Sequence, residues 1–160
     1  MPSVTTIRQR LEYLMDSASG IESQISRYND DPTTPLEEVD LPAYFVDRAG
    51  RAEHQNAAAQ ELFTSRRWLI WVVVQEIADN TIDSKQEADE AAEDLLDDLM
   101  YYLSQHSHLD VDENGNIDNG LSGLQGINWL GDGVKKEYQR ATKRYSALAI
   151  IAEVGSNRSS

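Results

Sequence analysis

Residues 62–77 read LFTSRRWLIWVVVQEI, and this stretch decides what the rest of the chain packs against. It is rich in aromatic and β-branched side chains, which favour a strand. Both alternating faces of residues 68–74 are apolar, which is typical of a strand in a sheet covered on both sides. Trp68 and Trp71 are separated by an odd number of residues, so a regular strand points them to opposite faces. We therefore predict a long, largely buried strand here.

Amphipathic helices are predicted on both sides of this strand. Segment 7–25 has apolar residues at helical spacing, and Gly20 is a point where this helix can break. Segment 84–103 carries one apolar stripe with its acids on the opposite, solvent-facing side. Ser84 and Glu87 have the spacing of a capping box, which predicts the start of this second helix. The two stripes are Ile7, Leu11, Leu14, Met15, Ala18, Ile21, Ile25 and Ala88, Ala91, Ala92, Leu95, Leu96, Leu99, Met100, Leu103.

The remaining segments predict further strands and the loops between them. Residues 41–46 predict a short strand, in which Pro42 is compatible only with an edge strand or with the start of a strand. Polar residues 47–56 predict an exposed loop. Residues 121–129 and 134–154 predict strands, with turns at 131–133 and near Lys143. The order of elements predicts an α+β fold, with helices packed on a mostly antiparallel β-sheet.

A single domain accounts for the whole chain. Its 160 residues fit one domain of ordinary size. We assign residues 1–154 to this domain and residues 155–160 to a frayed, polar C-terminal tail. The absence of cysteine excludes disulfide scaffolds and Cys-based zinc sites.

Charge is strongly unbalanced along the sequence. The chain has 28 acids and 14 Lys or Arg residues, a formal net charge of −14, which argues against charge-driven binding of DNA or anionic lipid. Segment 83–118 holds 12 acids and one base, whereas segment 119–160 holds 3 acids and 6 bases. The first residues lack the apolar core of a signal peptide, and the longest apolar run is far shorter than the ~20 residues that span a bilayer. We therefore expect a soluble protein made in the cytoplasm.

Two patterns resemble metal sites. In 110–121, oxygen ligands fall at the first, third, fifth and ninth positions of a calcium loop: Asp110, Asp112, Asn114 and Asp118. Leu121 occupies the twelfth position, where a bidentate Glu is required, so a solvated loop with an Asn-Gly turn is the simpler interpretation. In an extended chain His106, His108 and Asp110 would point the same way and suit iron or zinc. The simpler alternative is a helix C-terminus favoured by histidine.

The basic residues of the C-terminal part form the other candidate site. Five of the 14 bases are Lys135, Lys136, Arg140, Lys143 and Arg144. If residues 134–145 are one strand, Lys136, Arg140 and Arg144 share a face, and Arg66 and Arg67 are candidates for the same surface. Such a strip would contact an acidic partner, including another copy of the chain. An ordinary exposed strand face explains it equally well.

No motif of an enzyme is present. The sequence has no G-x-S-x-G, P-loop or G-x-G-x-x-G, and the carboxylates of 87–98 lie on a predicted solvent face. We expect no catalysis and no cofactor.

The order of elements resembles a known family. An N-terminal helix leads to Leu-Pro-Ala-Tyr-Phe-Val at 41–46, and Arg-Arg-Trp-Leu-Ile-Trp-Val-Val-Val follows at 66–74. A helix with Asp-Leu-Leu-Asp-Asp-Leu-Met at 94–100 comes next, then Gly-Leu-Gln-Gly-Ile-Asn-Trp at 123–129 and a final apolar stretch at 145–154. Across 4–154 this layout is similar to the tail terminator (tail completion, minor tail protein) family of long-tailed bacteriophages.

The resemblance implies a structural role in a virion. It implies a homo-oligomeric ring, a hexamer, that caps the tail tube, contacts the tail tube protein and joins the head-side connector protein. Genomic DNA would pass through the lumen without specific binding, and the particle would assemble in the host cytoplasm without a membrane. The alternatives are another neck or head–tail adaptor protein, a small calcium-binding module on 110–121, and a metal-dependent enzyme using His106, His108 and Asp110.

Overall fold

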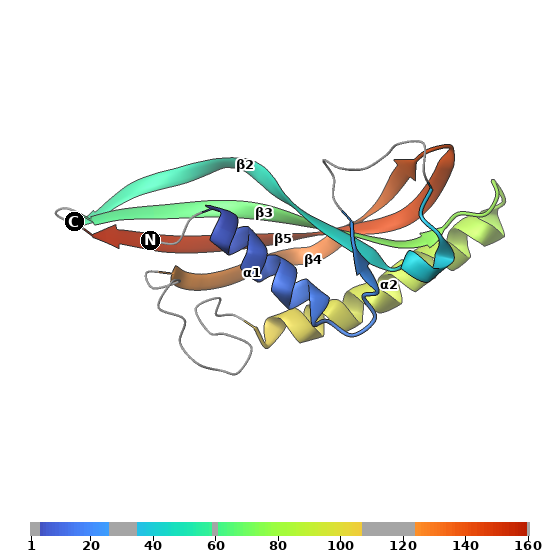
Figure 1. The fold of residues 1–160 in the computed structure, drawn as a ribbon, viewed down its shortest axis with the longest axis horizontal. Coiled ribbons are helices and arrows are strands. Elements are labelled where there is room, and N and C mark those ends of the chain that lie inside the picture. Colours follow the sequence, from blue (N-terminus) through green and yellow to red (C-terminus); the bar gives the residue numbers. More distant parts are fainter. Residues whose placement is uncertain (1–3, 26–34, 59–60, 107–123, 160) are drawn as a thin grey trace.

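The computed structural model describes residues 4–25, 35–58, 61–106 and 124–159 (Figure 1). It is an α+β fold in which two helices pack on a five-stranded, mostly antiparallel sheet. The elements in chain order are α1 (Val4–Asp16), β1 (Ser23–Gln24), the 3-10 helix η1 (Glu38–Asp40), β2 (Ala43–Ala58), β3 (Glu61–Glu76), α2 (Ile82–Ser104), β4 (Leu124–Arg140) and β5 (Lys143–Ser159). The predicted fold class is confirmed.

The sheet has the strand order β1-β2-β3-β5-β4, and among the described strands only β1 runs parallel to its neighbour. The long, largely buried strand predicted at 62–77 is confirmed as β3, which pairs with β2 on one side and β5 on the other. The predicted exposed loop 47–56 is wrong, because β2 continues through it with a register irregularity between Ala49 and Glu53. The ladder offered by β3 supplies backbone hydrogen bonds that the polar composition of this segment did not indicate.

The C-terminal half of the sheet is one long hairpin. A turn at 131–133 was predicted, yet β4 runs through it with a register irregularity between Leu130 and Val134. The chain reverses at residues 141–142 instead, where Ala141 has φ 55°, so the turn expected near Lys143 is confirmed. Residues 155–159 do not fray, because they continue β5 and pair with β3 back to Glu61.

Both helices differ from prediction at their ends. α1 stops at Asp16, and Gly20 follows with φ 91°, a left-handed conformation that glycine adopts without strain. α2 begins two residues before Ser84, and its N-cap is Thr81, whose hydroxyl accepts from the Ser84 N–H at 3.2 Å. The predicted Ser84 cap is therefore wrong, although the helix itself is confirmed.

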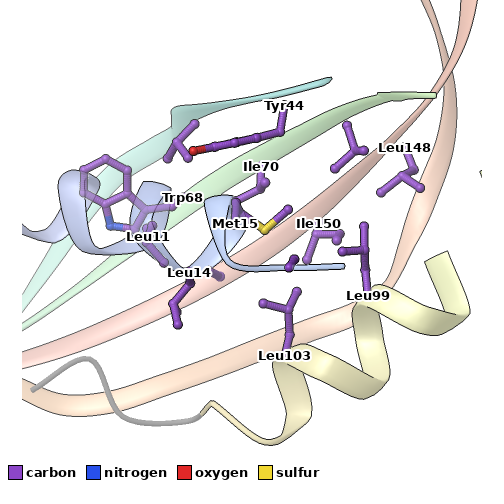
Figure 2. Close-up of a cluster of buried hydrophobic side chains, with 14 of the residues drawn as sticks. Leu11, Leu14, Met15, Tyr44, Trp68, Ile70, Leu99, Leu103, Leu148 and Ile150 are labelled. Carbon is purple, nitrogen blue, oxygen red and sulfur yellow. The ribbon is translucent and has the colours of Figure 1, made fainter. Parts of the chain in front are cut away.

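The main core lies between the helices and one face of the sheet (Figure 2). Buried residues of both predicted stripes belong to it, including Leu11 and Met15 from α1 and Leu99 and Leu103 from α2, each at 0–1% exposure. They meet the strand residues Tyr44, Trp68, Ile70, Val72, Leu148 and Ile150. The helical part of each stripe therefore has the packing role that its spacing predicted. Ile25, predicted to extend the first stripe, lies beyond α1 and packs on the opposite face of the sheet.

A smaller cluster covers the opposite face of the sheet, which we call the helix-free face. Val73, Tyr145 and Ala147 are buried there against Leu36, and Trp71 packs on the same cluster. Trp68 belongs to the main core and Trp71 to this second cluster, so the prediction that they point to opposite faces is confirmed. Both faces of the sheet are covered around β3, as its apolar run indicated.

Candidate subunit interface

The basic residues predicted to form one strip are divided by the β4–β5 turn. Lys136 and Arg140 hold register positions of the same parity on β4, opposite Ala147 and Lys143. Arg144 follows the turn and is on β5, where it lies opposite Gln139. The single strip was predicted only if residues 134–145 formed one strand. Because the chain reverses at 141–142, the three residues do not share one strand face, and that prediction is wrong. What remains is a basic hairpin end, which we define as Lys136, Arg140, Lys143 and Arg144.

Part of the charge at this hairpin end is already paired within the chain. Arg144 Nη1 lies 3.2 Å from Glu137 Oε1, and its other terminal nitrogen donates to Asn80 Oδ1. Lys143 Nζ lies 3.6 Å from Glu76 Oε2. These side chains are partly exposed, and ion pairs of this kind typically contribute only about 0–1 kcal/mol. They can therefore exchange partners at low cost.

Arg66 and Arg67 do not join the hairpin end. They are adjacent on β3 and so alternate between the two faces of the sheet, and Arg67 Nε lies 3.3 Å from Glu153 Oε2. The Lys136 register position aligns, through Ala147, with Val73, which is six residues along β3 from Arg67. At a rise of about 3.3 Å per residue, that separation is about 20 Å.

The acidic side of α2 is exposed, as its pattern predicted. The exposed carboxylates run along the outer surface of the helix, and we call this set the acidic helix surface: Asp83, Glu87, Glu90, Glu93, Asp94, Asp97 and Asp98. Lys85 is the one base within this helix. This surface and the hairpin end carry opposite charge on different elements of the chain.

An aromatic row lines part of the helix-free face. The rings of Phe45 and Trp71 stack with centroids 6.0 Å apart, and Tyr138 follows at 6.1 Å from Phe45. Tyr138 also lies 6.3 Å from Tyr145, whose hydroxyl accepts from the Leu36 N–H at 3.0 Å. Sequence reasoning missed this row, although Phe45, Trp71, Tyr138 and Tyr145 are all aromatic residues in predicted strands.

The hydroxyl of Tyr44 joins α1 to the sheet. It lies 2.7 Å from Asp16 Oδ1 and 2.8 Å from the Glu12 carbonyl oxygen. Burial, followed by the hydrogen bond to Asp16, raises the pKa of Tyr44 well above its ordinary value. The phenol therefore stays protonated and serves the structure.

A hollow of about 460 Å³ lies beside the end of β3 and the first turns of α2. Its wall combines apolar side chains with carboxylates: Leu36, Glu38, Leu41, Val74, Gln75, Glu76, Ala78 and Glu87. Among these residues there is no nucleophile beside a base, which acyl or phosphoryl transfer would need.

The predicted metal sites fall almost wholly outside the described residues. The calcium-loop candidates Asp110, Asp112, Asn114 and Asp118 lie there, as do His108 and the rest of 107–123. His106 is described, and its ring packs against Tyr102 with centroids 4.5 Å apart. Across the described ranges, no three His, Asp or Glu side chains converge on a common point that could hold a metal ion. Calcium binding by 110–121 stays a prediction.

The sequence was compared with protein-family models and with curated proteins. No protein-family model matches the chain, and no curated protein matches its sequence. Within the described part of the chain, neither helix is long and apolar enough to cross a membrane. Function is therefore inferred from the fold and from the charged surfaces.

Proposed function

We propose that the chain is a structural virion protein, a ring-forming tail terminator of a long-tailed bacteriophage. It caps the tail tube and joins the tube to the head-side connector. The observation that most supports this proposal is the fold: two helices on one face of an antiparallel sheet, in the element order that the family resemblance implies.

The distribution of charge supports association between copies. The acidic helix surface and the basic hairpin end lie on different elements, so one copy can offer its base-rich part to the acidic part of the next. Such a contact joins two different surfaces, and a contact of this type closes into a ring when the rotation between copies permits. The ring needs no cofactor and performs no catalysis.

The net charge also suits a passage for DNA. A formal charge of −14 repels phosphates, so duplex DNA can move through a lumen without being held. The basic hairpin end provides few phosphate contacts on such an acidic chain. We therefore expect no tight, salt-sensitive binding of DNA.

Light scattering and negative-stain electron microscopy test the proposal. We expect closed rings whose population decreases at high salt, since charge complementarity is screened. Combining Lys136→Glu, Arg140→Glu and Arg144→Glu should reduce the ring population while the circular dichroism spectrum stays unchanged. Arg10→Glu is the control, because it reverses a charge on α1, which belongs to neither of the two charged surfaces, and it should leave the rings intact.

Two results would contradict the proposal. A chain that remains monomeric at all concentrations and salt conditions does not form the ring. If the triple variant forms rings as the wild type does, the basic hairpin end is not part of the interface.

A further inference from the structure

We propose that neighbouring copies join through their sheet edges, with the outer edge of β4 in one copy pairing with the outer edge of β2 in the next. This inference rests on the proposed self-association and specifies how the copies meet. The partner is thus a second copy of this chain, and the contact is a backbone ladder that extends the sheet from one subunit into the next.

Among the described residues, no strand lies beside the outer edge of β4 or beside most of the outer edge of β2 (Figure 1). Within the described residues, β1 pairs only with Ala43 and Tyr44, so the remainder of the 16-residue β2 has no strand on its outer side. The 17-residue β4 ends the strand order on the other side. An open edge exposes unpaired N–H and C=O groups, which form a template for another strand.

The hydrogen bonds of β2 identify which of its residues face outward. The Tyr44 carbonyl accepts from the Ile25 N–H at 2.8 Å, so Tyr44 directs its backbone groups away from β3. The register of β2 is regular from Ala43 to Ala49, and the Arg48 N–H donates to the Asp47 carboxylate at 2.9 Å. Because backbone groups alternate between the two edges of a strand, Tyr44, Val46 and Arg48 share the outward direction.

The strand directions make this pairing favourable. β2, β3, β5 and β4 alternate in direction, so β4 runs opposite to β2. A copy rotated about an axis parallel to the strands therefore places its β2 antiparallel to the β4 of its neighbour. Antiparallel ladders are the more stable kind. Because the two edges differ, the contact is of the head-to-tail type, which closes into a ring when the rotation between copies permits.

The absence of proline and the position of the register irregularities both affect how these edges can pair. Neither 43–58 nor 124–140 contains proline, the residue that most directly blocks an edge. Each strand is irregular at two points. In β2 these lie between Ala49 and Glu53 and between Asn56 and Ala58, and in β4 between Leu124 and Gly126 and between Leu130 and Val134. These irregularities limit the length of regular edge with which an unrelated strand could pair. They therefore favour a partner strand that has an irregularity of its own at the matching position.

Amide hydrogen exchange on the wild-type chain tests the pairing directly. Backbone amides of the 45–58 and 124–140 segments should exchange about tenfold or more slowly in the assembled protein than in the diluted monomer. The amides of α2 serve as the internal reference and should change little. Rings in which both edge segments exchange as they do in the monomer would overturn this inference and leave the proposed function intact.

A proline substitution tests the same contact by another route. Arg48→Pro removes an outward N–H without removing a β2–β3 hydrogen bond, and Arg48→Ala removes the same exposed side chain but keeps the N–H. We expect Arg48→Pro to lose ring formation and Arg48→Ala to retain it. Because Arg48→Pro keeps its β4 edge, mixing it with wild-type protein should also reduce the wild-type rings.

The outcomes separate the two proposals. Open chains with protected edges would support edge pairing and contradict the closed ring. Arg48→Pro that assembles like Arg48→Ala would overturn edge pairing. If Arg48→Pro does not fold, the exchange measurement on the wild-type chain decides alone.

Discussion

Leu99→Ala should destabilise the protein by about 4 kcal/mol. Leu99 is 1% exposed and lies in the main core between α2 and the sheet (Figure 2). Loss of three buried carbon groups at about 0.8 kcal/mol each removes about 2.4 kcal/mol of transfer free energy. A residual cavity of roughly 50–80 Å³ at about 24 cal/mol per Å³ adds about 1–2 kcal/mol. Backbone hydrogen bonds hold both α2 and the strands in place, so the residues around Leu99 have little freedom to close the cavity.

Urea and thermal unfolding at a fixed protein concentration measure this loss. For a domain of this size, about 4 kcal/mol corresponds to a decrease in Tm of about 8–16 °C. Tyr101→Ala is the matched control, because Tyr101 is on the same helix but 70% exposed, and its change should stay within about 0.5 kcal/mol. A Leu99→Ala loss as small as that of the control would mean that α2 does not pack through this stripe.

Two further changes test the contacts that hold the helices in place. Tyr44→Phe removes the hydroxyl that bonds Asp16 and the Glu12 carbonyl, and it should cost about 1–2 kcal/mol in urea unfolding. The pKa of Tyr44 is raised in the folded state, so above pH 10.0, the ordinary pKa of tyrosine, the unfolded state releases a proton that the folded state keeps. The free energy of unfolding of the wild type should therefore decrease as the pH rises above that value. An equally steep decrease in Tyr44→Phe would contradict this. Thr81→Ala removes the α2 N-cap and should lower the free energy of unfolding by about 1 kcal/mol, more than Ser84→Ala does. A larger loss for Ser84→Ala would mean that Ser84 is the N-cap.

The candidate interface shows what residue patterns reveal and what they miss. The acidic helix surface was predictable, because a 3.6-residue period assigns each carboxylate to the side opposite the apolar stripe. The basic strip was not, since its geometry depends on one turn. With the reversal at 141–142, Arg144 leaves the strand that carries Lys136 and Arg140. The open edges were also missed, because a strand order cannot be obtained from the properties of single strands.

The sequence by itself determined those elements in which the pattern of apolar and polar side chains reflects which face is buried. Both helical stripes, the buried strand at 62–77 and the opposite directions of Trp68 and Trp71 follow from the periodicity of apolar residues, and the α+β class follows from their order.

Tertiary structure alone decided the lengths and ends of the strands. Residues 47–56 and 155–159 are polar, yet they are strands because β3 offers each of them a ladder along its two edges. Likewise, Gly131 and Gly133 did not end β4, because pairing with β5 resumes at Val134. Backbone hydrogen bonds are made by every residue type except proline at the N–H, so they leave little trace in side-chain composition, and a strand extends as far as its neighbour allows.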